Sequence, residues 1–140
     1  SSTWGYEHRG CMIRIPSSRG QNTRIENRLP GADTNPYLSL AAILAAGLDG
    51  IEKHMTPPAP QVKSDPYASD TAPLPKTLEE AMAALNADDF FRHALGSDFI
   101  SHYLQLRRHE LNRFNTWITD WEFKEYLEPR FYVQSTHITL

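Results

Sequence analysis

The sequence has very little cysteine and no excess of positive charge. Cys11 is the only cysteine, which excludes an internal disulfide and fits a reducing compartment, so a cytoplasmic location is expected. The 14 lysine and arginine residues are outnumbered by 17 aspartate and glutamate residues, for a formal net charge of -3. No general positive field would hold the chain on nucleic acid or on an anionic membrane, so we expect neither partner.

Long apolar runs are also missing. The longest apolar stretch, residues 37–48, is too short to cross a bilayer, and residues 1–9 lack the apolar segment of a secretory signal. What the sequence does contain is 40% hydrophobic residues, enough for one modest core. We therefore interpret residues 1–140 as one domain or part of one, outside the membrane.

The amino-terminal region predicts a small amount of β-structure. Two short strands are expected over residues 11–15 and 24–29, joined by residues 17–22, whose polar composition is that of a surface loop. Because two strands alone make a poor sheet, we expect further sheet neighbours upstream of residue 1.

The rest of the chain is predicted to be mainly helical. Asn35 is a good N-cap and Pro36 a good first residue for a helix that ends near residue 51 or 53. This helix is apolar nearly all round, which is typical of burial on most sides, and we expect the absent part of the sheet to cover it. Capping patterns predict later helices at Thr77 with Glu80, at Asp88 or Asp89, at Ser97 after Gly96, and at Thr119 with Glu122.

Residues 56–75 separate these helices and carry six of the ten prolines, so a long excursion loop is predicted there. The expected fold class is α+β, with a short antiparallel strand pair followed by a mainly helical carboxy-terminal shell.

A group of charged side chains near the predicted strands is the main candidate site. In an extended strand alternate side chains share a face, so Arg24, Glu26 and Arg28 should project together. The carboxylate of Glu26 is a ligand of the kind that Mg²⁺ and Mn²⁺ prefer. The planar guanidinium groups of Arg9, Arg14 and the neighbouring arginines fit the geometry of phosphate and carboxylate groups. The same spacing also fits a solvated ladder of ion pairs worth about 0–1 kcal/mol each. Spacing alone leaves both interpretations open.

Several motifs occur in a fixed order along the chain. They are Arg9, Ile13-Arg14-Ile15-Pro16, Arg24-Ile25-Glu26-Asn27-Arg28-Leu29-Pro30, Asn35-Pro36-Tyr37-Leu38, residues 45–51, residues 74–81 and the helix over 103–110. Together they closely resemble the carboxy-terminal part of the catalytic domain of the glutamine synthetase family, over about residues 4–127. Residues 4–6 and 117–126 are more similar to the branches of the family that ligate amines.

The resemblance implies an ATP-dependent ligase. Such enzymes phosphorylate the side-chain carboxylate of glutamate and let ammonia or a small amine displace phosphate from the acyl phosphate. It implies ATP and Mg²⁺ or Mn²⁺ as cofactors, and a homo-oligomeric ring. By position, Glu26 matches a metal ligand and Arg28 a substrate-binding arginine. Arg9 matches a catalytic arginine that contacts both substrate and ATP, while Arg14 and Arg24 match further ATP-binding residues.

The sequence also departs from the family pattern. His8 stands where the family commonly has asparagine, and the loop before Arg24 is shorter, with a frequent lysine replaced around Arg19 or Gln21. Tyr67 lies near the place of a nucleotidylated tyrosine in some bacterial members, but its surroundings differ, so modification is not expected.

The family's remaining metal ligands and nucleotide loops lie upstream of the matching segment. We therefore expect the isolated 140-residue chain to hold an incomplete, inactive site. The alternative, of another class, is a non-catalytic structural or assembly fragment of the same family. The sequence leaves open which amine is ligated, the oligomer stoichiometry and the role of residues 132–140.

Overall fold

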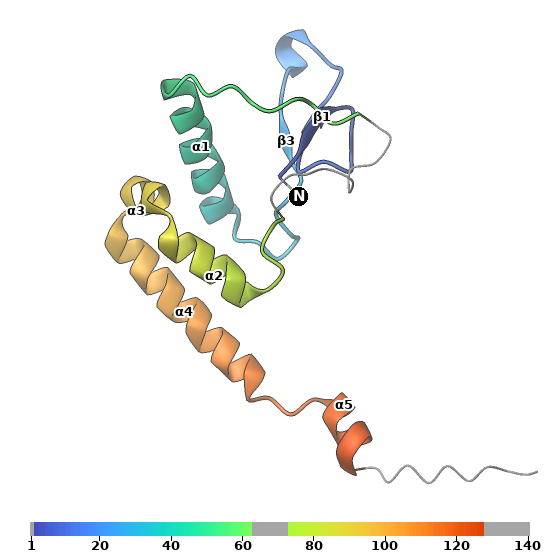
Figure 1. Ribbon diagram of the computed structural model, residues 1–140, viewed down its shortest axis with the longest axis vertical. Coiled ribbons are helices and arrows are strands. Elements are labelled where there is room, and N and C mark those ends of the chain that lie inside the picture. Colours follow the sequence, from blue (N-terminus) through green and yellow to red (C-terminus); the bar gives the residue numbers. More distant parts are fainter. Residues whose placement is uncertain (1, 63–72, 128–140) are drawn as a thin grey trace, which may run out of the picture.

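The computed structural model describes residues 2–62 and 73–127. A small three-stranded sheet stands at the amino-terminal end, and the helices between residues 36 and 115 form a group to one side of it (Figure 1). The last short helix lies apart from this group. The predicted excursion loop is therefore described only at its two ends. Tyr67 and residues 132–140 lie outside the described residues.

The sheet consists of β1 (Trp4–Tyr6), β2 (Ile13–Ile15) and β3 (Glu26–Asn27), in that order. β2 and β3 are antiparallel, which confirms the predicted pair, although both strands are shorter than expected. β1 was not predicted, and it pairs with β2 in parallel. The chain thus supplies one sheet neighbour itself, and further neighbours upstream of residue 1 stay a prediction.

The outer edge of β1 is held by a segment far along the sequence. The indole Nε1 of Trp4 donates to the carbonyl of Pro58 at 2.7 Å, and the backbone N–H of Gln61 donates to the carbonyl of Trp4 at 2.8 Å. Residues 56–62 form neither helix nor strand, as predicted for the start of the excursion loop. They nevertheless order the sheet, because they satisfy polar groups at its edge.

The helix α1 (Pro36–Glu52) begins where the sequence predicts. The side-chain oxygen of Asn35 accepts hydrogen bonds from the backbone N–H groups of Tyr37 at 3.0 Å and Leu38 at 3.3 Å. These donors have no partner within the helix, so the cap satisfies both. Lys53 follows the helix and pairs with Asp49 at 2.7 Å, where a cation suits the helix dipole.

The later helices are α2 (Leu78–Ala87), α3 (Asp89–Leu95), α4 (Ser97–Asn115) and α5 (Asp120–Glu122), with a π-helical turn over Phe123–Leu127. Their predicted starts are confirmed by the side-chain caps of Thr77 and Asp88 and by the capping box at Thr119. Gly96 separates α3 from α4 with a φ of 93°, a conformation that glycine adopts without steric cost. α2 and α3 pack on α4, and α3 also contacts α1.

The apolar core of the described residues is small. Cys11 is buried beside Gly5 of β1, while Met82 of α2 and Ile100 of α4 are buried where those helices meet. None of the described helices is long and apolar enough to cross a membrane.

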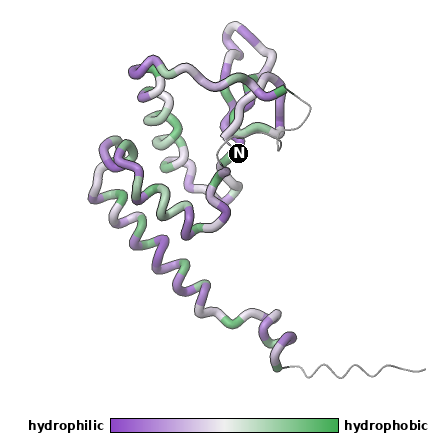
Figure 2. Tube along the Cα trace, in the orientation of Figure 1, coloured by the Kyte–Doolittle hydropathy of each residue, from purple (hydrophilic) through white to green (hydrophobic). Residues whose placement is uncertain are grey.

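One face of α1 remains uncovered. A stripe of large apolar side chains spaced three or four residues apart runs along the helix, and each member is more than half exposed: Tyr37, Leu40, Leu44, Leu48 and Ile51. Figure 2 shows the contrast between α1, which is mostly white to green, and the more polar α4. The described residues leave this face exposed, and burial of α1 by a part of the sheet outside them stays a prediction.

We predict that Asn35→Ala lowers the free energy of unfolding by about 1 kcal/mol, since it leaves two backbone donors of α1 without an acceptor. Asn35→Asp is the matched control, because it keeps an oxygen acceptor and adds a negative charge at the helix start. Urea unfolding followed by circular dichroism measures both. Equal destabilisation by the two variants would contradict the capping role.

Candidate active site

Arg14 lies at the centre of a linear group of alternating charges on the sheet. Its Nη1 donates to Oε2 of Glu26 at 2.6 Å, and its Nη2 donates to Oε2 of Glu7 at 2.5 Å. Arg24 donates from Nη2 and Nε to the other oxygen of Glu26, at 3.0 and 3.2 Å. The order Glu7, Arg14, Glu26, Arg24 therefore places each charge beside its opposite.

The strand register explains the central pair. Arg14 of β2 and Glu26 of β3 are directly opposite each other in the antiparallel ladder, where side chains of one face are in contact. Glu7 follows β1, and its backbone N–H donates to the carbonyl of Ile15 at 3.0 Å. This bond continues the pairing of β1 with β2 and brings the Glu7 carboxylate to the end of β2, where the backbone N–H of Ser17 also donates to it.

Arg9 and Arg28 are joined to each other rather than to Glu26. Nε of Arg28 donates to the backbone carbonyl of Arg9 at 2.9 Å, and the backbone N–H of Arg28 donates to the carbonyl of Met12 at 2.8 Å. The turn that carries Arg9 is thereby tied to the residue after β3. Both arginine side chains are exposed.

His8 organises that turn. Its Nδ1 accepts from the backbone N–H of Gly10 at 3.1 Å, and its backbone carbonyl accepts from Cys11 at 3.4 Å. An asparagine side chain makes the same contact to the N–H two residues on. The histidine that departs from the family pattern therefore keeps an acceptor here, while its buried Nε2 has no partner among the described residues.

The structure thus joins the five predicted site residues in two groups: Arg14, Glu26 and Arg24 through ion pairs, and Arg28 with the turn at Arg9. The expected contact between Arg24 and Glu26 forms, whereas Arg28 contacts the turn at Arg9. Their roles in metal, ATP and substrate binding stay predictions. Glu7 was missed, because its position depends on the parallel pairing of β1, for which the sequence gives no local signal.

The ion pairs fix the charge state of both carboxylates. Hydrogen bonds from Arg14, and then from Ser17, lower the pKa of Glu7 from an ordinary value of 4.5 to about 2. Arg14 and, to a smaller extent, Arg24 lower the pKa of Glu26. Glu7 and Glu26 in turn raise the pKa of Arg14, whose side chain is 14% exposed. All three groups are therefore charged at neutral pH.

The described residues fit one ligand of a divalent cation rather than a whole metal site. Glu26 offers the hard oxygen atoms that Mg²⁺ and Mn²⁺ prefer, and its side chain is 28% exposed. Both oxygens, however, accept from guanidinium groups. Within residues 2–62 and 73–127, no group of three histidine, cysteine, aspartate or glutamate side chains could hold a metal ion. The arginines do fit the charge and geometry of phosphate.

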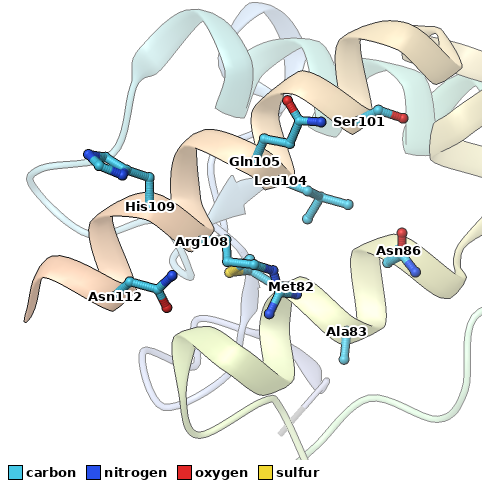
Figure 3. Close-up of a pocket in the computed structure, with 9 residues that line it drawn as sticks. All are labelled: Met82, Ala83, Asn86, Ser101, Leu104, Gln105, Arg108, His109 and Asn112. Atoms are coloured by element: carbon cyan, nitrogen blue, oxygen red, sulfur yellow. The ribbon is translucent and has the colours of Figure 1, made fainter. Parts of the chain in front are cut away.

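A separate groove of about 600 Å³ lies between α2 and α4. Figure 3 shows Arg108 reaching toward Met82 across the groove, while Leu104 points between the two helices. Its lining contains no carboxylate and none of the predicted site residues. The groove therefore adds no ligand to the charged group on the sheet.

The depressed pKa of Glu7 predicts a pH-dependent contribution to stability. Its ion pair contributes fully above about pH 4.5, the ordinary pKa, and the contribution is lost as the pH falls toward about 2. Glu7→Gln should therefore be less stable than the unchanged chain at neutral pH, with a difference that shrinks below about pH 4.5. Urea unfolding of both proteins across this range measures the difference, and a pH-independent difference would contradict the assignment.

The chain is similar to several known proteins. The profile of the glutamine synthetase catalytic domain matches residues 1–126. Gamma-glutamylethanolamide synthetase of Streptomyces coelicolor is 39% identical over 125 residues, covering 89% of this chain and 27% of the relative. Glutamine synthetase of Methanocaldococcus jannaschii is 39% identical over 131 residues, covering 89% and 29%. Glutamate-isopropylamine ligase of a Pseudomonas species is 37% identical over 130 residues, covering 91% and 28%.

A solved structure described as apo GmaS without ligand superposes with a TM-score of 0.78 at 35% identity, and covers 90% of this chain and 30% of that protein. The chain thus spans less than a third of the length of these relatives. The mixed α+β fold is that of a fragment of the same domain. With the domain profile matching residues 1–126, the chain belongs to the glutamine synthetase family.

Proposed function

We propose that residues 1–140 are part of an ATP-dependent ligase that joins the side-chain carboxylate of glutamate to ammonia or a small amine. The observation that carries this proposal is the contact of Glu26 with Arg14 and Arg24, with Arg28 just after β3 bound to the turn at Arg9, in a chain of this family. The names of its relatives, which include glutamine synthetases and glutamate-amine ligases, support the substrate class.

The proposed reaction has two steps. A carboxylate oxygen of glutamate attacks the γ-phosphorus of ATP and ADP leaves, which gives an acyl phosphate. The nitrogen of ammonia or an amine then attacks the acyl carbon, loses a proton and expels phosphate. Both steps move negative charge onto phosphoryl oxygens, where guanidinium groups held in place lower the barrier.

Each charged residue has a distinct part in this proposal. Arg28 binds the glutamate substrate, and Arg9 contacts both substrate and the transferred phosphate. Arg14 and Arg24 bind the nucleotide. Glu26 supplies one ligand to Mg²⁺ or Mn²⁺, and a metal bound there would neutralise phosphate charge.

The site needs residues from beyond the described ones. The chain covers only 27–30% of the length of its relatives, and Glu26 is a single ligand. We propose that further metal and nucleotide ligands come from outside residues 1–140, in a homo-oligomeric ring in the cytoplasm. The isolated 140 residues should then release no phosphate from ATP when glutamate, magnesium and amines are added. Turnover by this chain alone would contradict the incomplete site.

A second candidate function is a structural or assembly module without catalysis. It is favoured by the engagement of both Glu26 oxygens by arginines of the same chain, and by the uncovered stripe on α1. In this case the charged group on the sheet would act only as a network of ion pairs.

The Glu26→Gln variant separates the two functions. In the full-length protein, ATP with Mn²⁺ should raise the melting temperature, and this variant should weaken that binding about tenfold or more, since it removes a metal ligand. Glu110→Gln is the matched control, because it removes a glutamate that pairs with Arg107 on α4 at 2.7 Å. A discrete oligomer whose melting temperature is indifferent to ATP and Mn²⁺ would support the structural module.

A further inference from the structure

Glu7 has no role in the proposed reaction, yet both of its carboxylate oxygens are engaged. Oε2 accepts from Nη2 of Arg14 at 2.5 Å, and Oε1 accepts from the backbone N–H of Ser17. One side chain thus connects the guanidinium of Arg14 to the backbone just after β2. The side chain of Arg14 is therefore held by Glu7, which is anchored just after β2, as well as by Glu26 of β3.

The backbone of Glu7 supports a specific placement of this carboxylate. Its φ of 51° lies in the left-handed region, which is uncommon for residues other than glycine, asparagine and aspartate. Such a conformation costs free energy and persists where surrounding contacts determine it. Here those contacts are the backbone bond from Glu7 to Ile15 and the two side-chain contacts with Arg14 and Ser17.

The two carboxylates that hold Arg14 are not equivalent. Glu26 also accepts from Arg24 and is the predicted metal ligand, so its oxygens have competing partners. Glu7 contacts Arg14 and Ser17 alone among the described side-chain bonds. If Glu26 turns to another partner, Nη1 of Arg14 loses its acceptor while Nη2 keeps Glu7.

Arg14 also retains donors for a ligand. Its Nη1 and Nη2 each carry two N–H groups, and Glu26 and Glu7 each engage one of these nitrogens. Its Nε is buried and has no hydrogen-bond partner among the described residues, so the terminal nitrogens are the donors that a ligand can reach. A guanidinium held at one nitrogen, with the others available, suits an oxyanion such as a nucleotide phosphate.

We propose that Glu7 is a positioning residue: it holds Arg14 through Nη2, so that Arg14 stays in place and presents its remaining donors to a nucleotide phosphate when Glu26 exchanges its partner. This inference rests on the proposed function, because it takes phosphate binding by Arg14 as given. Since Arg14 holds the pKa of Glu7 near 2, the carboxylate is charged throughout the neutral range.

The test compares Glu7→Gln, Arg14→Ala and the double variant in the full-length protein, with MgATP affinity measured by calorimetry. Glutamine keeps an oxygen that can accept from Ser17, but it removes the charge that attracts Arg14. Glu7→Gln should weaken MgATP binding about 10- to 100-fold, and Arg14→Ala at least as much. Glu7→Gln should have no further effect in the Arg14→Ala background, because residues that act through one contact are not additive. The matched control Glu110→Gln should leave the affinity unchanged.

The outcomes separate the two levels of the argument. The proposed function of Arg14 fails if the unchanged protein does not bind MgATP. It also fails if the Arg14→Ala variant binds MgATP as tightly as the unchanged protein does. If Arg14→Ala weakens binding and Glu7→Gln does not, the positioning role is overturned. The same holds if Glu7→Gln weakens binding equally in both backgrounds, because its effect then bypasses Arg14.

A crystal structure of the unchanged full-length protein with MgATP provides a test that needs no variant. Nη2 of Arg14 should remain in hydrogen-bond distance of Glu7 while another of its nitrogens contacts a phosphate oxygen. Loss of the contact with Glu7 in that complex would overturn the proposal even if the variants fail to fold.

Discussion

The structure of the candidate site depends on one guanidinium between two carboxylates. Arg14 of β2 pairs with Glu26 across the antiparallel ladder and with Glu7 beyond the end of β1, so a single side chain ties all three strands together. Because Arg14 is largely removed from solvent, each carboxylate that pairs with it matters more than an exposed partner would. The short strands supply few ladder bonds, which makes these side-chain contacts important for the geometry of the sheet.

Features that depend on a few neighbouring residues could be predicted from the sequence. The cap of α1 at Asn35, the caps at Thr77 and Asp88 and the break at Gly96 were predicted because each signal lies within four residues of the element it controls. β1 could not be predicted in this way, since it has three residues and its edge is completed by residues 58–61. Its position is a property of the tertiary fold.

The same distinction applies to the site. Strand alternation predicted Arg24 beside Glu26, which the structure confirms. The roles of the other arginines rest on the order of the motifs and stay predictions. Glu7 was not predicted for the same reason as β1, because its carboxylate reaches Arg14 only through the parallel pairing of β1 with β2. The burial of α1 was predicted from its apolar composition. Such a composition indicates that other residues pack over a helix, but it does not indicate which residues these are.

The two edges of the sheet are not alike, and this determines the direction in which the sheet can be extended. On the β1 side, the carbonyl of Trp4 is already occupied by the backbone of Gln61. On the β3 side, no further strand is present within the described residues. Open edges favour pairing with additional strands. The edge of β3 is therefore the open one within the described residues, and a strand that paired there would bring its side chains beside Glu26.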